Sequence, residues 1–130
     1  MGEQIEEFKR LIPQFTDERG SIFDLIEEQV GHVGLITSNK GAVRGKHYHK
    51  KSTQFTFLLS GKMEFFTKDL RNKDSKVKSV IMEPYDLIAT PPNVAHAMRA
   101  IENCVFLDCT TESRGEQGYE QDTVRIEMEI

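Results

Sequence analysis

Short apolar stretches alternate with polar turn signals along almost the whole chain, and few segments have the length and period of a helix. This pattern is typical of a β-sandwich or a small β-barrel. We therefore expect an all-β protein. Its strands are predicted at 21–27, 30–38, 46–50, 53–60, 62–67, 77–83, 87–89, 95–100, 104–110 and 123–129.

Turn signals separate these strands. Gly61 predicts a tight hairpin because it stands between the apolar stretches 55–59 and 63–66, and the polar segment 70–75 predicts a solvated turn.

The ends of the chain are less regular. Apolar residues at 5, 8, 11 and 12 have helical spacing, so the first dozen residues predict either a short helix or a strand that pairs with a sheet. Segment 112–121 contains two glycines, three glutamates and a single apolar residue, Tyr119. We expect a loop there that is mobile or shaped by a ligand.

Composition limits the possible functions. The 130 residues predict one domain, 1–130, and no apolar run is long enough to cross a membrane. The first residues lack a signal-peptide pattern, and two cysteines that fall on opposite faces of one strand cannot pair, so we expect a cytoplasmic protein. Net charge is −4, and no basic cluster exceeds Lys50–Lys51, which argues against nucleic acid and anionic membranes as partners.

Candidate chemistry lies on one face of the predicted strands. His47 and His49 are two residues apart, so their imidazoles point the same way from one strand. The same alternation predicts an inner face that carries His47, His49, Gln54, Thr56, Leu58, His96 and Met98, with Phe55, Phe57 and Leu59 on the outer side. We expect the three imidazoles and the Gln54 amide to converge. His32, by contrast, is interpreted as an ordinary surface or core residue.

This residue set allows two kinds of chemistry. His47, His49, Gln54 and His96 could hold one divalent metal ion such as Zn, Fe, Ni or Mn. Because the Gln54 amide donates less charge than a carboxylate, a metal-free site in which histidine acts as a base is the other possibility. Arg44, just before the pair, is a candidate clamp for an anionic group.

Two sequence motifs resemble those of the cupin superfamily. The first runs from Gly41 through His47, His49 and Gln54 to Gly61, and the second runs over 84–96 and ends at His96. Within that superfamily, segments 15–20, 43–48 and 90–100 are similar to deoxythymidine-diphosphate-sugar 3,5-epimerases. The stretch 44–50 followed by Gln54 is more similar still to sugar-nucleotide 3,4-ketoisomerases.

The resemblance implies a cupin double-stranded β-helix, or jelly roll, that forms a homodimer and needs no metal. It implies proton transfer next to a keto group by His47 or His49, with Arg44 and Arg19 on the diphosphate of a sugar-nucleotide and His96 near the substrate. The enolate-stabilising lysine of the epimerases falls at about Thr56, and their acidic tyrosine falls near Asp108. The tyrosine expected in ketoisomerases has no counterpart in 34–36.

The leading hypothesis is therefore an isomerase or epimerase of a nucleotide-linked keto-sugar. His49 is predicted as the main base and His47 as the second proton carrier, while Gln54 and Asp108 orient them. Two alternatives stay open: a metal-binding cupin that uses His47, His49, Gln54 and His96, and a non-catalytic sugar-binding cupin.

Overall fold

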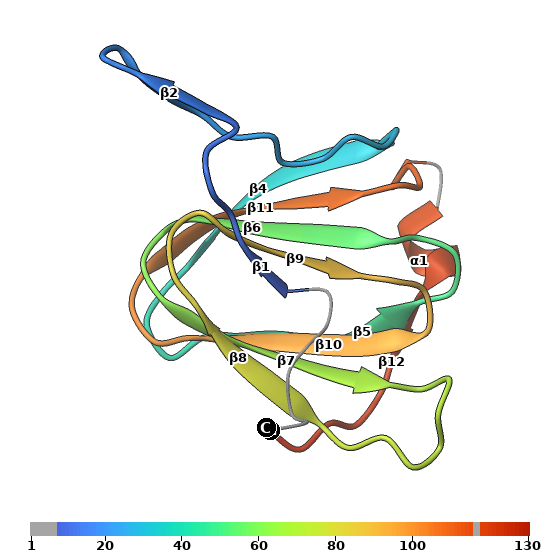
Figure 1. The fold of residues 1–130 in the computed structure, drawn as a ribbon. Coiled ribbons are helices and arrows are strands. Elements are labelled where there is room, and N and C mark those ends of the chain that lie inside the picture. The colour runs from blue at the N-terminus through green and yellow to red at the C-terminus, as the bar shows by residue number, and fades with distance from the viewer. Residues whose placement is uncertain (1–7, 116–117) are drawn as a thin grey trace.

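Two five-stranded antiparallel sheets face each other and form a flattened barrel (Figure 1). The computed structural model describes residues 8–115 and 118–130. The first sheet has the order β1 (Phe8–Arg10), β9 (Asp86–Thr90), β6 (Gln54–Ser60), β11 (Cys104–Thr110) and β4 (His32–Ser38). The second has the order β12 (Thr123–Arg125), β5 (Val43–His49), β10 (Val94–Ala100), β7 (Met63–Asp69) and β8 (Lys78–Met82). The predicted cupin jelly roll is confirmed.

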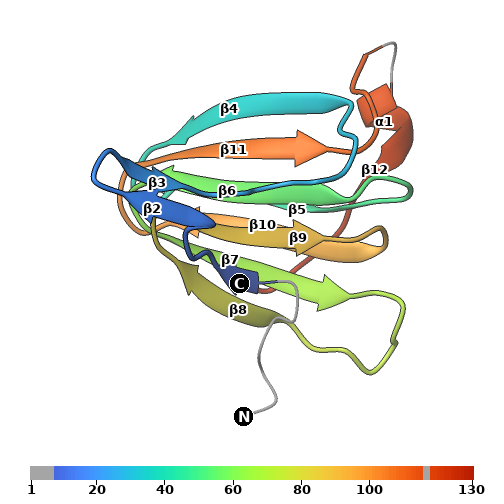
Figure 2. The same ribbon diagram turned by 45° about the horizontal axis from the view of Figure 1, so that its top comes forward.

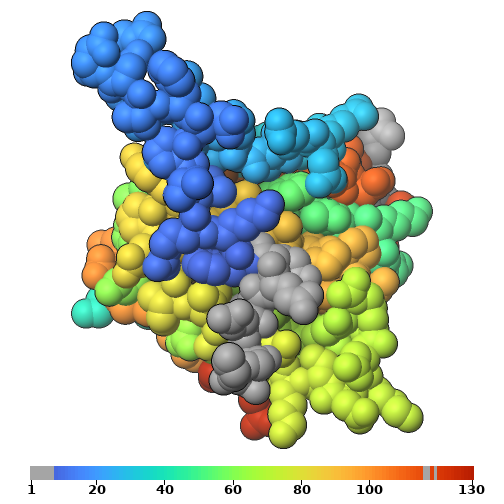
Figure 3. Space-filling model, viewed as in Figure 1, coloured from blue at the N-terminus to red at the C-terminus, as the bar shows by residue number. Residues whose placement is uncertain are grey.

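Two small elements complete the fold. β2 (Phe15–Asp17) and β3 (Gly20–Ile22) form a hairpin that projects away from the barrel, as the space-filling view also shows (Figure 3). The short helix α1 (Gly118–Asp122) lies at the end of the barrel towards which β11 points (Figure 2). No helix among the described residues has the length and apolar character that a membrane span needs.

The main core lies between the sheets at one end of the barrel. Nine buried residues form it: Leu58, Met63, Phe65, Met82, Ile88, Met98, Ala100, Cys104 and Phe106. They come from six neighbouring strands, so this half of the interior is filled by side chains.

The outer face of the first sheet is also covered. Phe55 and Phe57 point outward, as predicted, but they are 7% exposed because Leu11, Leu25 and neighbouring apolar residues pack on them. The N-terminal part of the chain thus gives the outer face of β6 an apolar environment.

Some predicted elements differ from the structure. The strand expected at 21–27 ends at Ile22, because Leu25 and Ile26 both pack against the same cluster and therefore do not alternate as strand residues must. Segment 112–121, predicted as a loop, contains most of α1. Near the N-terminus the strand alternative is correct from Phe8 onward, where β1 pairs with β9, and residues 1–7 lie outside the described residues. Predicted strand 123–129 ends at Arg125.

Candidate active site

Inward-facing positions change from apolar to polar along each central strand. On β6, Leu58 belongs to the core, while Thr56 and Gln54 are buried polar residues. On β10 the same change runs from Met98 to the buried His96. One end of the barrel is therefore filled with apolar groups, and the other end presents polar groups to a hollow.

A cavity of about 390 Å³ opens at this polar end. Its charged and polar lining consists of Arg44, His47, Gln54, Thr56, His96, Asp108, Arg114 and Arg125. In the described part of the chain, this lining has three guanidiniums and only one carboxyl group. The hollow therefore favours an anionic ligand.

A β-bulge in β5 shapes the cavity wall. β10 pairs His96 with His47 and Ala97 with Gly45, so Lys46 is an extra residue on β5. Gly45 and Lys46 both have positive φ, 93° and 62°. Uninterrupted alternation would place Arg44 and His47 on opposite faces, but the bulge lets both line the cavity.

The three predicted imidazoles do converge. One ring nitrogen each of His47, His49 and His96 lies within 4.8 Å of the others. The ring centroids of His47 and His96 are 4.7 Å apart. His96 is 3% exposed, and neither of its ring nitrogens has a side-chain hydrogen-bond partner among the described residues. A neutral imidazole has one unprotonated nitrogen, so His96 can offer one lone pair to a ligand or a metal ion.

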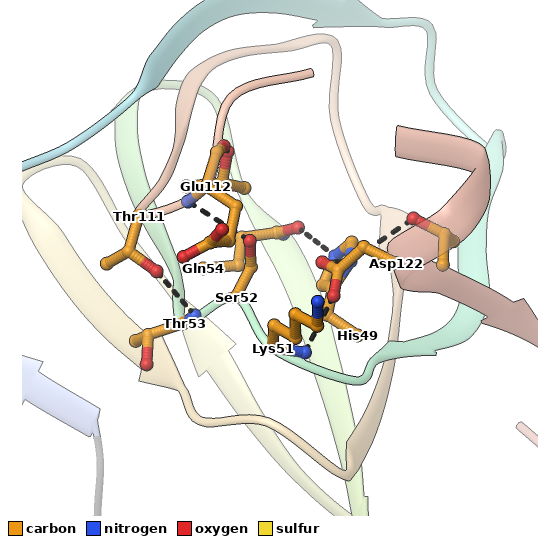
Figure 4. A network of polar contacts seen from close by, with 10 residues as sticks. His49, Lys51, Ser52, Thr53, Gln54, Thr111, Glu112 and Asp122 are labelled. Atoms are coloured by element: carbon orange, nitrogen blue, oxygen red, sulfur yellow. Dashed lines mark hydrogen bonds and ion pairs between the residues drawn. The ribbon is translucent and has the colours of Figure 1, made fainter. Parts of the chain in front are cut away.

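His49 lies behind the cavity and is held on both sides (Figure 4). Its Nε2 is 3.0 Å from Oε1 of Gln54, and its Nδ1 is 3.3 Å from Asp122 Oδ2 and 3.2 Å from Thr123 Oγ1. Asp122 is fixed in turn, since its Oδ1 accepts a hydrogen bond from the backbone N–H of Lys51 at 2.6 Å. The carboxylate of Asp122 therefore orients the imidazole of His49.

The Gln54 amide connects His49 to Asp108. Because its Oε1 faces His49, its Nε2 donates to Thr56 Oγ1 at 3.2 Å and to Asp108 Oδ1 at 3.3 Å. Thr56 donates to the same Asp108 oxygen at 3.0 Å. Asp108 lines the cavity, as its alternation with Cys104 and Phe106 predicted, but its contacts are to Gln54 and Thr56 rather than to an imidazole.

Burial decides the charge state of the site. It lowers the pKa of His47 to about 4, helped by the positive charges of His49, Arg125 and Arg114. Burial also lowers the pKa of His49, against the opposing effects of Gln54 and Asp122, and it brings the pKa of His96 well below its ordinary value. The pKa of Asp108 is raised to about 6, because burial outweighs the hydrogen bond from Thr56 and the charges of Arg114 and Arg44. At neutral pH the imidazoles are uncharged, as a base requires.

The structure brings together all but one of the predicted site residues. Arg44 lies at the cavity, where its Nε donates to Ser38 Oγ at 2.7 Å and its Nη2 donates to the Thr37 carbonyl at 3.0 Å. Arg19 is the exception: it lies on the projecting hairpin, pairs with Asp17 at 2.6 Å and does not line the cavity of its own chain. The prediction that Arg19 joins Arg44 at the ligand is thus not met within one chain.

Three further site residues were not predicted: Arg114, Asp122 and Arg125. They lie in or just after segment 112–121, which has no apolar periodicity. The pairing of β12 with β5 brings Asp122 and Arg125 to the site. The sequence signal for Arg125 was its place in a predicted strand, but its sheet partner could not be known from the sequence.

The fold and the site define a cupin-type barrel whose interior carries three histidines beside an arginine-lined cavity. Residues 15–112 match the family described as polysaccharide biosynthesis C-terminal domain, and the chain belongs to that family. No curated protein matches the sequence.

Solved structures with this fold include several sugar-nucleotide enzymes. A variant of the 3,4-ketoisomerase QdtA from Thermoanaerobacterium thermosaccharolyticum, in complex with TDP-4-keto-6-deoxyglucose, is 24% identical with a TM-score of 0.72, covering 95% of this chain and 90% of that chain. The dTDP-4-dehydrorhamnose 3,5-epimerase from Sulfolobus tokodaii is 20% identical with a TM-score of 0.71, covering 89% and 72%. RmlC from Legionella pneumophila, in complex with dTDP-4-keto-L-rhamnose, is 19% identical with a TM-score of 0.73, covering 95% and 74%. The resemblance predicted from the sequence is confirmed at the level of the fold.

Proposed function

We propose that this protein transfers a proton next to the keto group of a nucleotide-linked sugar and thereby isomerises or epimerises the sugar. The observation that supports this function is the cavity itself, which combines uncharged imidazoles with three guanidiniums. Guanidiniums match the oxygens of a diphosphate, and an uncharged imidazole can accept a proton from a carbon beside a carbonyl. The similar structures that were solved with keto-sugar nucleotides support the same substrate class.

His47 and His49 are proposed as the two proton carriers. Their roles are exchanged relative to the sequence prediction, in which His49 was the main base. His47 lines the cavity, whereas His49 has both ring nitrogens engaged by Gln54, Asp122 and Thr123. We therefore propose that His47 takes the proton from the substrate and that His49 acts behind it. Gln54 links His49 to Asp108, which can store or release a proton near neutral pH.

Deuterium exchange tests this function directly. The protein is incubated in heavy water with a deoxythymidine-diphosphate 4-keto-6-deoxysugar, and deuterium uptake beside the carbonyl is followed by NMR. We expect uptake by the wild type, a loss of roughly 10²–10⁴-fold in His47→Asn and a smaller loss in His49→Asn. Arg44→Ala should mainly weaken binding, since it removes charge-assisted contacts to the diphosphate.

His32→Asn is the matched control, because it makes the same substitution on the edge strand β4 and should leave exchange unchanged. If His49→Asn alone abolished uptake, the base would be His49, as the sequence predicted. Binding by the wild type without uptake over hours would instead establish a sugar-binding module.

A metal-binding function is the second candidate, and His96 is the observation that favours it. Its two buried ring nitrogens lack side-chain partners among the described residues, and they lie beside two further imidazoles. If a divalent ion binds, Gln54→Glu should tighten it, because a carboxylate stabilises a cation better than an amide does. Elemental analysis that finds no metal in either form, after incubation with excess Zn, Ni, Fe and Mn, would contradict this candidate.

Assembly as a homodimer in the cytoplasm completes the proposal. Exposed apolar side chains support the dimer: they lie at Ile12, Phe15, Ile22, Val33 and Leu35. The two free, buried thiols of Cys104 and Cys109 support a reducing compartment. In a dimer, Arg19 on the projecting hairpin could still reach a ligand in the other subunit.

A further inference from the structure

Arg125 has a special place among the three cavity arginines. In the pairing of β12 with β5, Arg125 lies directly opposite His47. Residues directly opposite each other on paired strands project from the same face of the sheet, with Cβ atoms roughly 5 Å apart. Both side chains line the cavity, and Arg125 is exposed, so its guanidinium is accessible to a bound substrate.

Arg44 occupies a different part of the cavity. Its guanidinium is tied to Ser38 and to the Thr37 carbonyl, both on the edge strand β4. Its charge influences Asp108, whereas the charge of Arg125 influences His47 and lowers the pKa of that imidazole. Arg44 is thus suited to hold one part of a ligand, and Arg125 stands beside the proposed proton acceptor.

We infer that Arg125 is a catalytic residue that stabilises the negative charge formed on the substrate's carbonyl oxygen when His47 removes the neighbouring proton. This inference rests on the proposed function. The C–H bond electrons become the second bond of a carbon–carbon double bond, the carbonyl π electrons move to oxygen, and the proton goes to the His47 ring. Arg125 donates N–H to the resulting enolate oxygen, and return of the proton to carbon completes the step.

The placement suits such a role, because the oxygen and the acidic hydrogen of a ketone are separated by only two carbon atoms. A cation next to the base therefore lies next to the developing charge. A fixed donor aimed at developing charge contributes about 10²–10³-fold to rate. A residue that held only the diphosphate would change substrate affinity and leave the rate at saturating substrate unchanged.

The test compares Arg125→Gln, Arg125→Lys and Arg99→Gln in the deuterium-exchange reaction, with substrate affinity measured separately by calorimetry. We expect Arg125→Gln to lose about 10²–10³-fold in exchange at saturating substrate, with dissociation constants within about fivefold of wild type. Arg125→Lys keeps the charge and should retain exchange to within about tenfold. Arg99 is the control, since its guanidinium lies over the Phe66 ring on the outer face of the same sheet, and its variant should match wild type.

Unchanged exchange in Arg125→Gln at saturating substrate would overturn the inference, with or without a loss of affinity. Absence of exchange by the wild type would refute the proposed function itself, and the role of Arg125 would fall with it.

Discussion

Asp108 shows how a single buried carboxyl group makes the stability of the protein depend on pH. Its pKa is raised from 3.8 to about 6, mainly by burial, so the folded state disfavours its charged form. Between these two values the folded protein holds a proton that the unfolded chain has released. The contribution of Asp108 to stability is therefore greatest below pH 3.8 and is lost as pH rises through 6. His47 acts in the opposite direction, because its lowered pKa makes the folded state less stable as pH falls from 6.5 to about 4.

Asp108→Asn removes the titration of Asp108 and keeps that of His47, so it separates their contributions to the pH dependence of stability. An amide can still accept the hydrogen bond from Thr56 but carries no charge, so the variant should be more stable than wild type at about pH 7. That advantage should shrink as pH falls from about 6 to 3.8. Urea denaturation at a series of pH values checks this, with the exposed Asp74→Asn as control. A constant difference between Asp108→Asn and wild type across this range would contradict the raised pKa of Asp108.

At the scale of single elements, the bulge in β5 determines which residues reach the cavity. Gly45 is required there for two reasons: its φ is 93°, and an added Cβ would lie 2.8 Å from the His96 carbonyl oxygen and 2.9 Å from Ala97 Cα. Both obstructing atoms belong to the backbone of β10, so they cannot move aside as a side-chain end could.

Gly45→Ala should therefore destabilise the protein and displace β5 from β10. Gly41 provides a close comparison, since its φ is 90° but no atom lies within 4 Å of the position that an added methyl group would take. Gly41→Ala should cost about 1–2 kcal/mol from conformation alone, and Gly45→Ala should cost more and also impair ligand binding. Urea unfolding and calorimetry measure both variants. Equal effects would show that β10 accommodates the methyl group.

The elements that the sequence predicted well are those with regular alternation. Strand 104–110 has the predicted bounds, because Cys104, Phe106 and Asp108 face inward while Val105 and Leu107 face outward. The placement of the histidines followed from the same rule. The bulge was not predictable, since Lys46 has no side-chain feature that marks a positive φ. Asp122 and Arg125 escaped prediction because their neighbours on β5 are far earlier in the chain, as in the contact of Thr123 with His49.

At the scale of the whole molecule, the exposed apolar side chains form the strongest indication of assembly. Leu35 is 66% exposed and Val33 is 58% exposed, and both lie on β4, an edge strand of the first sheet. Phe15 and Ile22, also exposed, lie on β2 and β3 of the hairpin. An edge strand with apolar side chains invites pairing with another chain.

Light scattering at micromolar concentration should therefore give twice the mass of one chain. Leu35→Asp should shift the protein towards monomers without destabilising it, because the side chain is already exposed within one chain. Ile81→Asp on β8, the edge strand of the other sheet, is the control and should leave the mass unchanged. A monomeric wild type would contradict the dimer and would remove any role of Arg19 in a neighbouring subunit's site.

The two cysteines on opposite faces of β11 give the protein a pair of natural reporters of partial opening. Cys104 belongs to the core between the sheets, whereas Cys109 lies under the N-terminal covering of the outer face. If that covering detached alone, a thiol reagent would reach Cys109 while Cys104 stayed protected. Simultaneous labelling would instead mean that the covering and the barrel open as one cooperative unit.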